Sequence, residues 1–192
     1  NHATGSHPFA KLYWNSKESK TAKNNPWFNV DAPHPFSVFH DFNHESPLVR
    51  EFVKRNLKFL LEEYKFDGFR FDLMGVHDLD TMKAVRKALD QVNPDIMVYG
   101  EGWTGGESAL PAAQQATKNH IYQLDRVGAF SDDIRDGIKG SVFDFLDKGF
   151  VSGKDNMEEN IKFSVVAATP HSQVTLTKAG DKCTNWSGQP GQ

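Results

Sequence analysis

Residues 65–75 read KFDGFRFDLMG, and residues 96–103 read IMVYGEGW. Each stretch is a short apolar run, typical of a buried strand, that stops at an acid: Asp72 in the first and Glu101 in the second. Between them, residues 80–92 repeat apolar positions at helical spacing. Strand, helix and strand together have about the length that a parallel crossover needs. The sequence therefore predicts an α/β fold with both acids at the carboxyl ends of neighbouring parallel strands, where barrel enzymes carry their catalytic groups.

The flanking stretches extend this pattern. Ser46 and Pro47 predict a helix start, with the serine hydroxyl as cap, and an apolar stripe continues from there to Tyr64. Residues 3–46 are rich in Pro, Asn, His and aromatic residues without periodicity, which predicts a long irregular loop excursion. Further along, the pattern predicts an irregular stretch, a short strand, a short helix and a closing loop, at residues 102–119, 129–131, 133–139 and 177–192.

The bulk composition limits the classes of partner. The 192 residues carry 22 Lys and Arg against 25 Asp and Glu, so we expect no nucleic-acid partner. Since no apolar run approaches the roughly 20 residues that cross a bilayer, we also expect no membrane-spanning segment. The single cysteine, Cys183, excludes an internal disulfide, and the absence of Cys/His ligand spacing around it disfavours a structural zinc site.

The chemistry open to the two acids depends on their separation. Neighbouring parallel strands lie about 4.8 Å apart, so the carboxyls can approach to about 5–5.5 Å, as in a retaining glycosidase. There one carboxylate attacks the sugar carbon, while the other protonates the leaving oxygen and later activates water. Arg70 lies two residues before Asp72 on the same strand face and could keep that nucleophile ionised. Glu101, close to the apolar ring of Trp103, would be less easily ionised, which suits the acid role.

Each of these residues also has a structural interpretation. A lone Asp at a strand end is more often a loop hydrogen-bonding group or a helix cap, Arg70 could belong to an ordinary ion pair, and Trp103 could be a core residue. His77 could bind substrate at the rim of a cleft, whereas Asp78 or Asp80 could cap the next helix. The combination of Arg-x-Asp with Glu-Gly-Trp on the next strand favours the catalytic interpretation.

The loop excursion leaves its own alternatives open. Trp14, Trp27 and Phe28 could stack on sugar rings or form a small core under the loop. The histidines of this stretch have no regular spacing, so we expect them to be exposed or bonded to the loop rather than to form a metal cluster. They are His7, His34, His40 and His44.

Residues 69–78, FRFDLMGVHD, and residues 99–103, YGEGW, resemble the second and third signature regions of the α-amylase family of glycoside hydrolases. They are most similar to type I pullulanases, which cleave α-1,6 branch links, and the resemblance continues through residues 129–153. It implies that Asp72 is the nucleophile, Glu101 the general acid/base and Arg70 the residue that orients Asp72. Trp103 and His77 are further candidates for contacting substrate.

The same resemblance implies a partial TIM (β/α)8 barrel. Asn1 and His2 resemble the end of the first signature region, so His2 would contact the sugar next to the cleaved link and Asn1 could be a calcium ligand. The fourth signature region, which carries the third catalytic acid, does not occur. Residues 1–192 would therefore form part of one catalytic domain, roughly from the end of strand three to just before strand seven. Residues 3–46 would be the loop excursion, and residues 47–192 the barrel βα units.

Two features depart from the family pattern. Gly75 and Val76 stand where α-amylases usually carry Lys-His, which weakens an α-1,4-cleaving interpretation. Residues 3–46 are more similar to α-amylases of gut Bacteroidetes than to pullulanases. Either a natural subgroup with an amylase-like loop or an artificial join near residues 67–73 would explain the mixture.

The resemblance thus implies a fragment of a retaining glycoside hydrolase that cleaves α-1,6 links in pullulan, amylopectin or starch. The alternatives are an α-1,4-cleaving α-amylase and a catalytically inactive glucan-binding fragment. No cofactor is expected to be required, and calcium stays open. We expect the parent enzyme to be secreted or at the cell surface. The isolated chain is expected to be inactive, because its sheet edges would be open and the third acid absent.

Overall fold

The computed structural model describes residues 2–31 and 40–165. They fall into two compact units that divide between Ala129 and Phe130. The expectations for His34, Cys183 and residues 177–192 fall outside the described residues. In the described part, no helix has the length and apolar character needed to cross a membrane.

The first unit is built on a three-stranded parallel sheet with the order β5-β6-β7. Its strands are β5 (Gly68–Phe71), β6 (Met97–Gly100) and β7 (Gly128–Ala129). Phe71 pairs with Gly100, and Gly100 pairs with Ala129, so the three strands end at the same level. Helix α3 (Leu79–Asp90) connects β5 to β6. The strand-helix-strand unit expected from the sequence is therefore confirmed.

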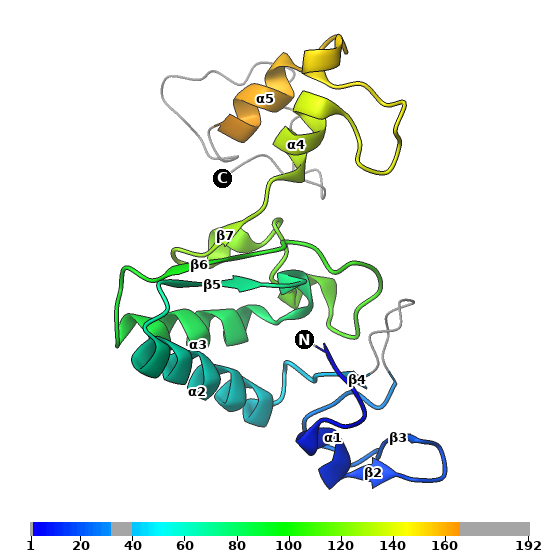
Figure 1. The fold of residues 1–192 in the computed structure, drawn as a ribbon, viewed down its shortest axis with the longest axis vertical. Helices are drawn as coiled ribbons and strands as arrows, with labels where there is room; N and C mark the ends of the chain where they lie inside the picture. The colour runs from blue at the N-terminus through cyan, green and yellow to red at the C-terminus, as the bar shows by residue number, and fades with distance from the viewer. Residues whose placement is uncertain (1, 32–39, 166–192) are drawn as a thin grey trace. The chain divides into compact units, whose positions relative to one another are not determined.

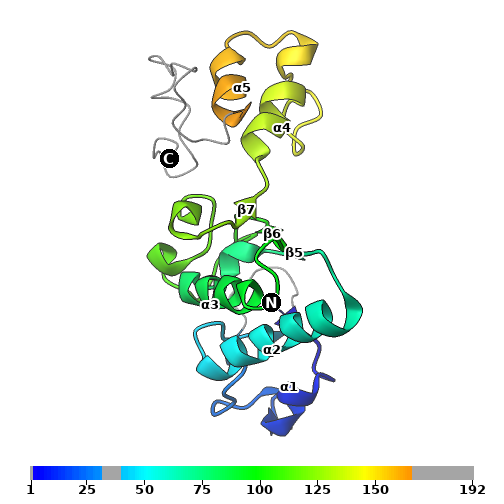
Figure 2. The same ribbon diagram turned by 90° about the vertical axis from the view of Figure 1, so that its left-hand side faces the viewer.

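Two helices cover one face of this sheet. Helix α2 (Pro47–Tyr64) lies beside α3, and both lie beneath the strands (Figures 1 and 2). On β5, Phe69 and Phe71 are buried whereas Arg70 between them is exposed, so alternate residues face the helices. The core contains side chains of the strands and both helices, among them Leu57, Leu61, Phe69, Phe71, Met82, Val85, Leu89 and Val98.

The two helices begin differently. The hydroxyl of Ser46 does not cap α2, which corrects the expectation; it donates instead to the carbonyl of Pro26, 2.8 Å away, and so ties the loop excursion to the helix start. At α3, Asp78 accepts from the amide of Thr81 at 2.9 Å and pairs with Arg50 at 3.0 Å. The helix cap expected from Asp78 or Asp80 is therefore Asp78.

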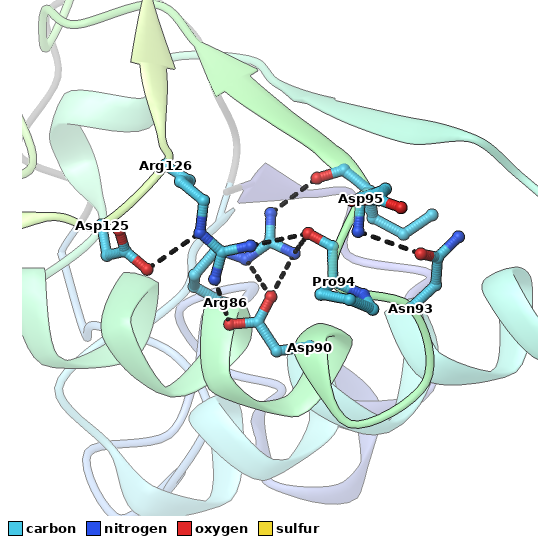
Figure 3. A network of polar contacts seen from close by, with 8 residues as sticks. Arg86, Asp90, Asn93, Pro94, Asp95, Asp125 and Arg126 are labelled. Carbon is cyan, nitrogen blue, oxygen red and sulfur yellow. Dashed lines mark hydrogen bonds and ion pairs between the residues drawn. The ribbon is translucent and has the colours of Figure 1, made fainter.

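A buried arginine joins α3 to the chain that enters β6 (Figure 3). Arg86, whose side chain is 4% exposed, donates to the carbonyl of Ile96 at 2.6 Å and to Asp90 at 2.9 Å. Arg126, just before β7, donates to the carbonyl of Pro94 at 2.6 Å and to Asp90 at 2.7 Å. Because Asp90 and the carbonyls satisfy the guanidinium, its burial is compensated, and the network fixes the entry into β6.

The loop excursion contains small elements of its own. Besides helix α1 (Pro8–Leu12), it has two antiparallel pairs, β1 (His2–Ala3) with β4 (His40–Asp41) and β2 (Trp14–Asn15) with β3 (Lys20–Thr21). Phe28 is 2% exposed and stacks on Phe42 with ring centroids 4.4 Å apart. Trp27 stacks on Phe9 at 4.9 Å. Of the two alternatives for Trp27 and Phe28, stacking on sugars or packing in a small core under the loop, the structure shows the packing.

Short 3-10 turns complete the first unit: η1 (Met74–Val76), η2 (Ala112–Gln114) and η3 (Ile121–Gln123). The described part of the second unit contains α4 (Asp132–Lys139), η4 (Phe150–Ser152) and α5 (Glu158–Val165). As expected from the sequence, α4 ends at Gly140, whose positive φ of 96° suits glycine. Its backbone N–H donates to the carbonyl of Asp136 at 2.8 Å.

Candidate active site

Asp72 and Glu101 follow the last residues of two hydrogen-bonded parallel strands. Because Phe71 pairs with Gly100, the two acids leave the sheet at the same level. The amide of Glu101 also donates to the carbonyl of Phe71 at 3.0 Å, which continues the strand pairing to the acid itself. Gly100 is required here, since a Cβ on it would lie 2.7 Å from the Phe71 carbonyl oxygen. The sheet therefore brings the two predicted acids together.

Arg70 contacts both acids. Its Nη1 donates to Oδ1 of Asp72 at 2.5 Å, and its Nη2 lies 2.8 Å from Oε1 of Glu101. The exposed fractions of the side chains are 38% for Arg70, 58% for Asp72 and 19% for Glu101. The hydrogen bond with Asp72 raises the pKa of Arg70, so the guanidinium stays charged. One fixed cation thus links two carboxylates of different exposure.

Glu101 has a more polar setting than the sequence suggests. Its Oε2 accepts from the backbone amide of Leu73 at 2.8 Å, while Oε1 faces Arg70. Both carboxylate oxygens thus have polar contacts, in contrast to the apolar environment expected from Trp103. Trp103 is half-buried, and its backbone carbonyl accepts from the amide of Gly75 at 3.1 Å.

The turn after Asp72 is packed directly on the loop after Glu101. A Cβ on Gly75 would lie 2.5 Å from the backbone carbon and oxygen of Trp103. The amide of Gly75 also approaches the carbonyl of Glu101 at 3.2 Å. From the sequence, Gly75 was only a departure from the family pattern, and Leu73 had no predicted role. The glycine itself was the available signal, because so close a backbone approach leaves no room for a side chain.

A pocket beside Asp72 lies between β5 and α2. Aromatic and aliphatic side chains make most of its wall, and Arg70, Asp72 and two histidines lie along it. The remaining lining residues are Phe42, Phe52, Val53, Asn56, Leu57, Phe69 and Phe71. The candidate nucleophile therefore borders an apolar wall with a few polar groups, the usual character of a small-molecule site.

The two histidines of this pocket are buried against each other. His44 and His77 are each 5% exposed, and their ring centroids are 4.0 Å apart. Burial lowers the pKa of His44 to about 3 and lowers the pKa of His77 well below its ordinary value. Both nitrogens of His44 and Nδ1 of His77 lack a hydrogen-bond partner within residues 2–31 and 40–165. The expectation of an exposed or loop-bonded His44 was therefore wrong, because its ring packs against the buried ring of His77.

The other predicted site residues are placed less completely. His2 lies in β1, opposite Asp41 of β4, and its side chain is outside what the structure describes. Asn1, the suggested calcium ligand, is also outside the described residues. Among the residues that are described, no three His, Cys, Asp or Glu side chains gather as a metal site would require.

Comparison with known proteins finds pullulanases. No family model matches the chain. The pullulanase of Bacillus subtilis is 28% identical over 160 residues, which cover 78% of this chain and 22% of that protein. Pullulanase A of Streptococcus pneumoniae is 32% identical over 125 residues, covering 64% of this chain and 10% of that protein.

A solved structure agrees with these relatives. The pullulanase from Anoxybacillus sp. LM18-11, complexed with maltotetraose, is 34% identical, with a TM-score of 0.67 over 72% of this chain and 21% of that protein. The chain thus spans only 10% to 22% of the length of these three pullulanases. Its mixed α/β architecture fits part of those TIM-barrel enzymes. By sequence and by structure the chain is therefore similar to a part of the pullulanases, in agreement with the resemblance to the α-amylase family.

Proposed function

We propose that the protein carrying this chain is a retaining α-glucan hydrolase that cleaves α-1,6 links in pullulan- and starch-type polysaccharides. One observation carries the proposal: Arg70 bridges Asp72 and Glu101 at the ends of two adjacent parallel strands. A retaining glycosidase needs two carboxyls about 5–5.5 Å apart, and strands about 4.8 Å apart can present them so. The guanidinium of Arg70 holds the carboxylates of Asp72 and Glu101 next to each other at the ends of the two strands.

Asp72 supplies the nucleophile in this mechanism. Its carboxylate attacks the anomeric carbon while the glycosidic bond breaks, and Glu101 donates a proton to the departing sugar oxygen. Asp72 attacks as a carboxylate, and Arg70 pairs with that carboxylate. The products of this step are a glycosyl ester on Asp72 and a free sugar hydroxyl.

Glu101 supplies the base for the second step. Its carboxylate takes a proton from water, the water oxygen attacks the anomeric carbon, and the ester bond to Asp72 breaks. The amide of Leu73 and the guanidinium of Arg70 both stabilise the carboxylate that this step requires. Two inversions at the same carbon leave the configuration of the sugar unchanged.

The preference for α-1,6 links rests on the relatives and on Gly75. Pullulanase is the name of both relatives compared above, and the solved pullulanase holds maltotetraose. At position 75, where α-amylases usually carry lysine, an added Cβ would overlap the backbone of Trp103. An α-amylase-like side chain therefore does not fit this turn. Within the barrel we assign β5, β6 and β7 to strands four, five and six, which corresponds to a segment from the end of strand three to just before strand seven.

Hydrolysis of defined polymers tests the linkage. The enzyme that carries this chain should release maltotriose from pullulan and should leave unbranched amylose largely intact. Cleavage of amylose with pullulan untouched would instead assign it to the α-1,4-cleaving alternative. Binding of both polymers without any cleavage would support the inactive glucan-binding alternative.

Two matched variants test the roles of the acids. Asp72→Asn should lose both steps, for glucans and for substrates with an activated aryl leaving group. Glu101→Gln should lose glucan cleavage by about 10²–10⁴-fold. It should still release the aryl group in one rapid burst, because a good leaving group needs no proton. Equal losses on both substrate types in the two variants would contradict the assigned roles.

A further inference from the structure

The residue after Asp72 has an unusual backbone conformation. Leu73 has φ 42° and ψ 54°, in the left-handed region that residues other than Gly, Asn and Asp seldom occupy. Such a residue persists only where its surroundings hold it, and in enzymes these positions cluster at active sites. The contacts of Leu73 show what holds it.

Leu73 is held from both sides. Its amide donates to Oε2 of Glu101 at 2.8 Å. Its side chain lies against the loop after Glu101, where a Cβ built on Gly105 would be 3.0 Å from Cδ2 of Leu73. The next residue, Met74, is completely buried, and the amide of Gly75 approaches two carbonyls of the same loop. The positive φ lets the amide reach Glu101 while the following residues turn inward.

The two oxygens of Glu101 are consequently not equivalent. Oε1 lies 2.8 Å from the charged Nη2 of Arg70, which disfavours a proton on that oxygen. Within residues 2–31 and 40–165, Oε2 accepts from the neutral amide of Leu73, and it keeps a second lone pair for a proton. Oε2 is therefore the oxygen on which the acid form of Glu101 carries its proton.

We propose that the backbone amide of Leu73 is a positioning group for Glu101, which fixes Oε2 as the proton-carrying oxygen of the acid/base. The role of this amide in proton transfer rests on the proposed function, whereas the position of the amide rests on the contacts of Leu73 alone. The left-handed conformation at position 73 is then the structural condition for this alignment, and side chains that resist it should disturb proton transfer more than binding.

Titration of the amide tests the contact directly. In the chain labelled with ¹⁵N-leucine, the Leu73 amide signal, assigned by its loss in Leu73→Gly, should follow a single-proton pH titration. The titration should survive in Asp72→Asn and vanish in Glu101→Gln. A Leu73 signal that does not titrate, or that titrates equally in Glu101→Gln, overturns the proposal. Because this readout needs no sugar chemistry, it can succeed even if glucan hydrolysis is not found.

Kinetics in the enzyme that carries this chain test the consequence. Leu73→Val and Leu73→Gly both remove the side-chain contact with Gly105 and keep the amide. Valine resists a positive φ, whereas glycine accepts it. We expect kcat to be about tenfold lower in the valine variant than in the glycine variant, with similar KM. Equal kcat values in the two variants would reject the positioning role while leaving the proposed function intact.

Discussion

Mild acid should destabilise the first unit through its buried histidines. The ordinary pKa of histidine is 6.5, and burial lowers that of His44 to about 3. Below pH 6.5 the imidazole binds a proton in the unfolded chain but not in the folded chain, so the free energy of unfolding falls as the pH falls. The stabilising contribution is complete above pH 6.5 and is lost progressively down to the folded pKa of about 3. The pKa of His77 is lowered in the same direction and adds to the effect.

The magnitude follows from these two values. At pH 5 an unfolded imidazole is about 97% protonated and a folded His44 about 1%, which corresponds to about 2 kcal/mol of stability lost between pH 8 and pH 5. A loss of this size is a large part of the stability of an ordinary domain.

Urea unfolding at pH 8, 6.5 and 5 measures the effect. Tryptophan fluorescence is a suitable signal, because Trp14, Trp27 and Trp103 all lie in the first unit. The His44→Asn variant keeps a polar side chain without a titrating group, so its loss between pH 8 and pH 5 should be about 2 kcal/mol smaller. If this variant shows the same pH dependence as the parent chain, the reasoning about His44 is wrong.

Three further changes have defined outcomes. Gly75→Ala should lower the free energy of unfolding by about 1–3 kcal/mol, because its Cβ would lie 2.5 Å from backbone atoms. Gly128→Ala, with 3.4 Å to the nearest atom, is the matched control in urea unfolding. Arg86→Met replaces a side chain that is 4% exposed and should lower the free energy of unfolding by about 3–5 kcal/mol. Arg126→Met replaces one that is 47% exposed and should lower it by at most about 1 kcal/mol. Equal shifts in thermal melts would contradict this difference. Phe145, 99% exposed, should promote self-association, so Phe145→Ser should reduce the larger species in sedimentation velocity.

The predictable parts of the site are those encoded by local pattern. Alternating apolar residues in β5 and β6 located both strands, and the acid after each strand followed from the same pattern. The helix predicted over residues 47–64 has the bounds of α2, since Pro47 favours its start and Lys65 leaves the helix with a positive φ of 57°. Arg70 could be placed beside Asp72 because residues two apart share a strand face.

The remaining parts depend on contacts between distant segments. Nothing adjacent to His44 in sequence shows that it meets His77, which is 33 positions later by number. Leucine carries no signal for a left-handed backbone, so the conformation of Leu73 could not be read from its residue type. The contacts of Glu101 with the Leu73 amide and with Arg70 were also missed, because the sequence pattern indicated only the nearby ring of Trp103.

The contacts described above between Arg70, Asp72, Leu73 and Glu101 lie within the first unit. Arg70 and Asp72 come from the end of β5, Glu101 from the end of β6, and Leu73 from the turn that packs between them. The helices beneath these strands belong to the same unit. Selectivity between α-1,6 and α-1,4 links has a different origin, since it depends on groups that contact the sugars on either side of the cleaved bond. Variants of the turn at Leu73 should accordingly change the rate of cleavage of α-1,6 and α-1,4 links alike, without changing which linkage is preferred.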